Sequence, residues 1–212
     1  MLLHPALLLS LLLAPAPDSG LALQAVVQTN FEYLSSSRTT NAEFWIVSLD
    51  RTYEKRGNQV RRVVQFAPPA ETKADFHTLG FDYEPNFRLV KIEDTTSTRT
   101  VLGRTCRLTT AWATADYAEA HLRFWLCPQS DEREAKLNAA VARAVSGRFS
   151  NLEQETVKLL ESRHGQIVLE ASSDIEPPIA PLMKLTARVL SLDAKAIEGN
   201  LTLPPEGDRD AR

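Results

Sequence analysis

Both cysteines and two of the three tryptophans of this 212-residue chain lie in one stretch, Thr100 to Pro128. Two runs rich in Thr, Val, Leu, Trp and Phe flank a turn-prone segment at residues 114–117, a pattern that predicts a β-hairpin. A turn centred on residues 116 and 117 sets Cys106 opposite Cys127. This stretch therefore constrains the fold more than any other part of the chain.

The same register sorts the large side chains of the hairpin onto two faces, because successive residues of a strand point to opposite sides. One face holds Leu108 opposite Trp125 and Trp112 opposite His121, and the other holds Leu122, Phe124 and Leu126. Both faces carry bulky apolar groups, so we expect neither face of the sheet to be wholly solvated.

The N-terminus indicates export. An apolar run at residues 6–14 is too short to span a bilayer comfortably as a mature helix, and a segment rich in proline and small residues follows it. We expect a signal peptide at residues 1–22 with cleavage after Ala22, the rival cleavage sites being Ala16 and Ala25. The protein is then periplasmic or secreted and is not integral to the membrane after cleavage.

An exported chain with two cysteines favours one disulfide, Cys106 to Cys127. Their separation is too long for a C-x-x-C redox motif, and two distant thiols are too few to hold a metal ion. We therefore predict a structural disulfide and no metal site.

Alternation of apolar and polar residues predicts strands on both sides of two helices. The strands are expected at 23–34, 42–49, 51–56, 59–66, 87–93, 166–171, 182–192 and 197–203. Helical spacing at 130–146 and 150–164 follows a capping sequence at Ser130-Asp131 and the capping-box pattern Ser150-x-x-Glu153. The order predicts an α+β fold, with two late helices packed on one face of a curved antiparallel sheet of about 8–11 strands, an incomplete β-barrel. We expect a single half-barrel domain at 23–207 and a disordered tail at 208–212.

The composition and the motifs argue against several classes of function. A formal net charge of −3 offers no general attraction to nucleic acid. The histidines after the signal peptide, His77, His121 and His164, fall in different predicted elements, and there is no H-E-x-x-H, G-x-S-x-G, Walker or G-x-G-x-x-G motif. We therefore expect neither an enzyme nor a cofactor.

Two short motifs carry a resemblance to a known group of proteins: Gly103-Arg104-Thr105-Cys106 and Leu203-Pro204-Pro205-Glu206-Gly207. With the intervening helices and alternating strands, the chain from about residue 100 to 207 resembles uncharacterised exported bacterial proteins related in architecture to the outer-membrane lipoprotein carriers. The resemblance implies a curved antiparallel sheet, an incomplete barrel, with helices over its concave face.

On this basis we expect a non-enzymatic binding or carrier protein of the cell envelope, for a lipid or another apolar ligand. The candidate ligand-binding residues are Trp112, Phe124, Trp125 and Leu137. The alternative is a structural or protein-interaction domain of the envelope, whose concave face is filled by its own helices. An envelope hydrolase is a third possibility, which would need two converging acids or an activated nucleophile.

Overall fold

The computed structural model describes residues 20–56, 59–63, 85–147, 149–176 and 182–197. Within these residues the strands form one nine-stranded antiparallel sheet in the spatial order β4-β3-β2-β1-β9-β8-β7-β6-β5. The strands are β1 (Leu21–Tyr33), β2 (Ser36–Ser48), β3 (Arg51–Arg56), β4 (Gln59–Val63), β5 (Arg88–Val101), β6 (Arg104–Ala115), β7 (Ala118–Pro128), β8 (Gln166–Glu176) and β9 (Met183–Ala196).

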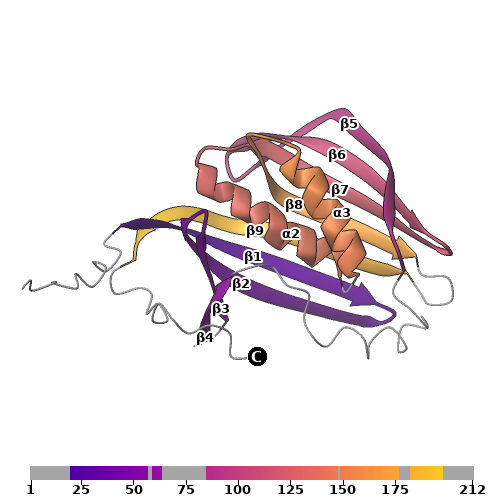
Figure 1. The fold of residues 1–212 in the computed structure, drawn as a ribbon, viewed down its shortest axis with the longest axis horizontal. Coiled ribbons are helices and arrows are strands. Elements are labelled where there is room, and N and C mark those ends of the chain that lie inside the picture. The colour runs from indigo at the N-terminus through magenta and orange to yellow at the C-terminus, as the bar shows by residue number, and fades with distance from the viewer. Residues whose placement is uncertain (1–19, 57–58, 64–84, 148, 177–181, 198–212) are drawn as a thin grey trace, which may run out of the picture.

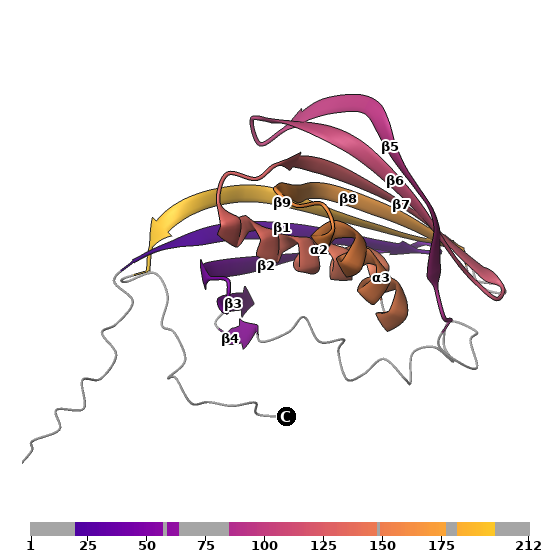
Figure 2. The ribbon, with the colours of Figure 1, turned by 45° about the horizontal axis from the view of Figure 1, so that its top comes forward.

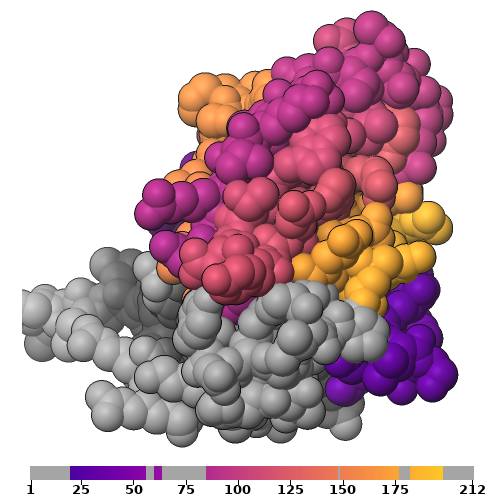
Figure 3. All heavy atoms as spheres, turned by 90° about the vertical axis from the view of Figure 1, so that its right-hand side faces the viewer, coloured from indigo at the N-terminus to yellow at the C-terminus, as the bar shows by residue number. Residues whose placement is uncertain are grey.

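The sheet curves around two helices and does not close, since its outermost strands β4 and β5 do not pair with each other. A short 3-10 helix, η1 (Glu132–Ala135), leads into α2 (Lys136–Ser146), and α3 (Ser150–Glu161) follows. Figures 1 and 2 show both α-helices against the concave face. Figure 3 shows the strand order from one end of the sheet, from β5 in magenta to β1 and β2 in indigo. The predicted open, half-barrel-like α+β architecture is confirmed.

The main core lies between the helices and the sheet. Along β7 every second residue from Ala118 to Leu126 is buried, while the residues between them are exposed or half-buried. Leu137 and Val141 of α2 are buried in the same cluster as Phe124. An apolar helix stripe and the apolar face of a sheet each need such a partner, and here each covers the other.

A second, smaller core lies on the other side of the sheet near its N-terminal strands. Phe44 and Ile46 of β2 belong to the main core, whereas Trp45 between them belongs to a separate cluster with Ala22, Tyr53 and Ile197. Because neighbouring residues of a strand point to opposite faces, β2 buries side chains on both sides. This cluster attaches the ends of β1 and β9 to β2 and β3.

The central hairpin has the predicted register. Ala115 pairs with Ala118 across a two-residue turn, Leu108 pairs with Trp125, and Trp112 pairs with His121. Alternation of side chains and a turn-prone sequence were sufficient to predict this pairing.

One strand is longer than predicted and one helix cap differs from the prediction. The strand expected at 87–93 continues as β5 to Val101, where Asp94 and residues 98–101 pair with β6 and the register shifts between Asp94 and Thr98. The N-cap of α3 is Phe149, whereas the predicted capping box places Ser150 at that position. The N-cap of the preceding helical segment is Asp131, whose carboxylate accepts the Arg133 backbone N–H. The predictions for 1–19, 198–203 and 208–212 lie outside the described residues.

Candidate functional site

The Cys106–Cys127 disulfide joins β6 to β7 at the open end of the central hairpin. The two Cα atoms are 4.2 Å apart, and both residues are fully buried. The predicted pairing is confirmed. A disulfide of this kind fits a protein of an oxidising compartment. Within the described residues, no helix is long and apolar enough to cross a membrane.

The four candidate ligand-binding residues are divided between the two faces of the sheet. Phe124 and Leu137 are buried together in the main core. Trp112 and Trp125 are only partly buried, and they alternate with the inward-facing residues of β6 and β7. The four side chains therefore do not line one cavity.

Cationic side chains cover both tryptophans on the outer face. The Lys91 ammonium lies 4.8 Å from the Trp112 ring centroid, and the Arg99 guanidinium lies 4.1 Å from that of Trp125. Arg99 also pairs with Glu170 of β8. Cation–π contacts of this geometry stabilise an exposed aromatic surface. These contacts explain the position of the two tryptophans without a ligand.

The sheet splits between β8 and β9. Their pairing runs from Ile175 with Met183 to Glu170 with Arg188. Beyond that point β9 pairs with β1 alone among the described residues, and a bulge leaves Leu190 without a partner in β1. Bulges bend a strand and can end its pairing. Figure 2 shows the yellow C-terminal half of β9 curving away beyond the start of β8.

Asn138 of α2 pairs with the edge of β8 that β9 leaves. Its Nδ2 donates to the carbonyl of Gln166 at 3.2 Å, and its Oδ1 accepts from the N–H of Val168 at 2.9 Å. The residue is only 5% exposed. A side-chain amide carries the same donor and acceptor as a peptide group, so Asn138 satisfies backbone groups that would otherwise be buried without partners.

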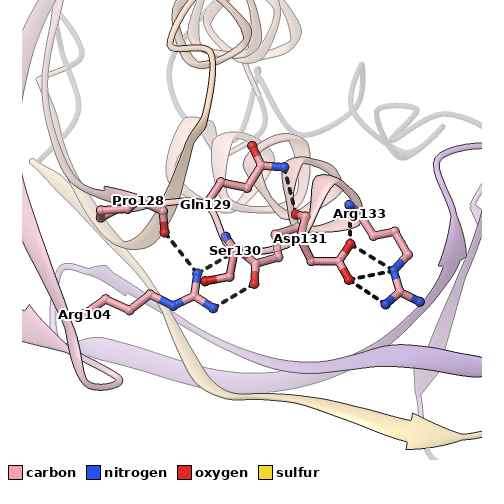
Figure 4. Close-up of polar contacts among 7 residues, drawn as sticks. Arg104, Pro128, Gln129, Ser130, Asp131 and Arg133 are labelled. Atoms are coloured by element: carbon pink, nitrogen blue, oxygen red, sulfur yellow. Dashed lines mark hydrogen bonds and ion pairs between the residues drawn. The ribbon is translucent and has the colours of Figure 1, made fainter.

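A buried ion pair joins η1 to the start of β6, next to the β5–β6 turn. Its partners are Arg104 and Glu134. Arg104 donates to both carboxylate oxygens of Glu134, each at 2.7 Å, and to the carbonyl of Pro128 at 3.2 Å. Glu134 is 2% exposed and also accepts the Ser130 N–H at 3.0 Å. The hydrogen bonds to Glu134 raise the pKa of Arg104 above its usual value. Figure 4 shows this arrangement with β9 running below it.

A groove of about 370 Å³ opens between that turn and β9. We call it the β9 groove, and it is lined by Leu102, Arg104, Leu190, Ser191, Leu192 and Asp193. Leu102 and Leu190 are 44% and 41% exposed, whereas Leu192 is partly buried against the main core. The groove is thus lined by leucine side chains together with polar and charged groups.

Leu102 has a backbone conformation that is unusual for its residue type. Leu102 and Gly103 have φ values of 48° and 75°, the left-handed region that tight two-residue hairpin turns use at both central positions. Asn, Asp and Gly adopt it readily, but a leucine there is strained by about 1 kcal/mol. Outliers of this kind concentrate at functional sites, and this one places an exposed leucine at the groove.

The two charges of the β9 groove are not equivalent. Arg104 is paired with Glu134, as described above, and so is close to neutralised. The exposed Asp193 forms no side-chain hydrogen bond or ion pair with any described residue, although its backbone pairs with Gln24 of β1. The groove therefore presents, beside its leucines, a negative charge that no described side chain pairs.

One buried acid outside the groove titrates abnormally. Glu153 of α3 is 8% exposed, and desolvation raises its pKa to about 6, opposed only in part by the positive charge of Arg143. A group of three or more His, Cys, Asp or Glu side chains able to hold a metal ion is not found in the part of the chain that the structure describes.

Most residues of the β9 groove were not predicted from the sequence. Leu190 and Leu192 have the alternating pattern of an ordinary strand, and Asp193 is one acid among many. Leu102 precedes a glycine, which is the only local signal for a tight turn at the groove. No protein-family model matches this chain, and no match to it is found among the curated proteins.

Proposed function

We propose that this protein is a non-enzymatic binding protein of the cell envelope that holds a lipid chain or another apolar ligand in the β9 groove. The observation that carries the proposal is the convergence of Leu102, Leu190 and Leu192 on one hollow. Its volume, about 370 Å³, is within the usual range of small-molecule sites, roughly 300–1,000 Å³. Burial of apolar surface there favours binding by about 25 cal/mol for each Å² removed from water.

The closely packed core argues for this position of the ligand. Leu137, Val141 and Val145 of α2 are at most 1% exposed and pack with the inward-facing residues of the sheet. A ligand between helices and sheet would have to displace these contacts, since protein interiors are filled at nearly crystalline density. A ligand in the β9 groove leaves the core intact.

Two features of the chain support placement in the envelope. The apolar N-terminal run has the composition of an export signal, and the disulfide fits an oxidising compartment. The resemblance to proteins related to the lipoprotein carriers points to the same compartment and to an apolar ligand.

The same packed core favours a second candidate, an envelope interaction domain that has no small ligand. The two candidates differ in whether a small molecule co-purifies with the protein. Native mass spectrometry of the protein purified from its host should show an added mass from a lipid or another apolar molecule if the proposal holds.

Titration with a fluorescent long-chain fatty acid tests the site directly. Leu190→Asp should weaken binding about tenfold or more, because it places a charge among the leucines. Leu49→Asp is the matched control: Leu49 is also 41% exposed, but it lies at the β2–β3 turn, and its replacement should leave binding unchanged. If the purified protein carries no added mass and neither a fatty acid nor another apolar ligand binds, the interaction domain replaces the binding protein.

A further inference from the structure

We infer that the ligand of the β9 groove is an extended polypeptide segment that pairs with β9 along Leu190–Asp193 and places a basic side chain beside Asp193. This inference rests on the function proposed above and names the class of its apolar ligand. It depends on the backbone beside the groove, which an acyl chain would not use.

The first argument is the strand edge. The last pair between β8 and β9 is Glu170 with Arg188. If this antiparallel register continued past the split, Leu190 would face Val168 and Leu192 would face Gln166. Asn138 satisfies the β8 side of that missing ladder. Among the described strands, only β1 pairs with β9 at Leu190–Asp193, so its other edge has the hydrogen-bonding groups to which an added strand binds.

The second argument is the pair of exposed leucines beside this edge, Leu102 and Leu190. Natural proteins protect exposed edges with bulges and charges, and the bulge at Leu190 and the acid at Asp193 are devices of that kind. Protection alone does not account for two exposed leucines, Leu102 and Leu190, that face the same groove. In recognition by strand addition, the backbone gives affinity and pockets beside the edge accept alternate side chains.

The third argument is charge. Glu134 already compensates Arg104, whereas the carboxylate of Asp193 has no partner among the described side chains. A basic residue near the end of the added segment would compensate Asp193, and an acidic residue would be repelled. Four residues of β9 span roughly 13 Å at the usual rise of a strand, so a segment of about four to six residues fits.

The test uses the complete exported protein and three synthetic eight-residue probes. The first alternates valine and threonine and ends in lysine, the second has glutamate in place of that lysine, and the third repeats the first with alternate backbone nitrogens methylated. Fluorescence anisotropy of the labelled probes gives their affinities. We expect the lysine probe to bind best and methylation to weaken it about tenfold or more, because it removes backbone hydrogen bonds.

Substitution of Asp193 tests the charge. Asp193→Asn should weaken the lysine probe about twofold to fivefold, the range of an exposed ion pair, and Asp193→Lys should reverse the preference toward the glutamate probe. Asp50→Asn, at the exposed β2–β3 turn, is the control and should change neither affinity. NMR locates the peptide: the amide signals of residues 190–193 should shift, and those of the outer strand β4 should not.

The outcomes separate this inference from the proposed function. Fatty-acid binding with no binding of any peptide probe overturns the inference and leaves the apolar-ligand function in place. Equal binding of the methylated and unmethylated probes also overturns it, as do signal shifts confined to β4 or β5. Failure of both the fatty acid and the peptides to bind removes the proposed function as well.

Discussion

Asn138 Oδ1 accepts the backbone N–H of Val168 at 2.9 Å, so a helix side chain replaces a strand at the edge of β8. The amide group of the same residue donates to the carbonyl of Gln166. Through these two bonds α2 satisfies the β8 edge at the split, and the β9 edge keeps its backbone groups for another partner. The helix therefore satisfies β8 where β9 separates from it, and the separated part of β9 lines the β9 groove.

Asn138→Leu should destabilise the protein by about 2–4 kcal/mol, because it leaves a backbone donor and an acceptor unpaired in a buried place. Urea unfolding measures the change. Asn41→Leu, at an exposed position of β2, is the control and should change stability by less than about 0.5 kcal/mol. Equal effects of the two substitutions would show that the hydrogen bonds from Asn138 to β8 do not stabilise the protein.

Arg104→Met should cost about 3 kcal/mol or more of stability, since it leaves the buried carboxylate of Glu134 without its cation. The double variant with Glu134→Met should recover much of that loss, because no uncompensated charge is left. Arg123→Met, which breaks the exposed pair with Asp174, is the matched control and should cost less than about 1 kcal/mol. A double variant as unstable as Arg104→Met alone would contradict this account of the ion pair.

The raised pKa of Glu153 predicts a pH-dependent stability. The folded state keeps this proton up to a pKa of about 6, whereas the unfolded chain loses it near the ordinary glutamate pKa of 4.5. Stability therefore falls as the pH rises from about 4.5 through 6, by about 2 kcal/mol in total, and stays lower above that range.

Urea unfolding between pH 4 and 8 measures this change. Glu153→Gln should remove the step and stabilise the protein above pH 6, because the neutral amide carries no buried charge. Glu161→Gln, at an exposed position of the same helix, should leave the step in place. A Glu153→Gln variant with the same pH dependence as the wild type would show that Glu153 does not cause the step.

Much of the central hairpin was predictable because the information is local. The alternation of side chains from Cys106 to Cys127 and the turn between them determine which residues face each other. The same alternation separates Phe124 from Trp125, which are adjacent in β7. The proposed grouping of these two residues in one ligand site ignored that rule.

The split between β8 and β9 was not predictable, because it depends on residues distant in the sequence. Asn138 in a helix pattern is an ordinary polar residue until its distance to Val168 is known. Leu190 and Leu192 fit an alternating strand, and only the extra residue relative to β1 shows the bulge. Where two strands of a sheet stop pairing depends on contacts between residues distant in the sequence, and not on local strand propensity.

The start of β1 bears on where the predicted signal peptide would be cleaved. Leu21 is the first residue of β1, its carbonyl accepts from Arg133 Nη1 at 2.7 Å, and Ala22 is fully buried. Cleavage after Ala22 or Ala25 would cut within this strand, whereas cleavage after Ala16 leaves it whole. N-terminal sequencing of protein from the host should therefore give a start before Leu21. A start at Leu23 would mean that the first pairs between β1 and β9 are dispensable.

The strained turn at Leu102 predicts opposite effects on stability and binding. Leu102→Asn places a residue that tolerates positive φ before Gly103, the sequence that tight hairpin turns prefer, and should stabilise the fold by about 1 kcal/mol. It also removes an apolar side chain from the β9 groove and should weaken binding of the apolar ligand several-fold.

Leu34→Asn is the matched control, since Leu34 has a φ of 56° in the β1–β2 turn, away from the groove. It should stabilise the protein to a similar degree and leave binding unchanged. Urea unfolding and ligand titration of the two variants separate these effects, and unchanged binding in Leu102→Asn would show that the strain at this turn does not serve the groove.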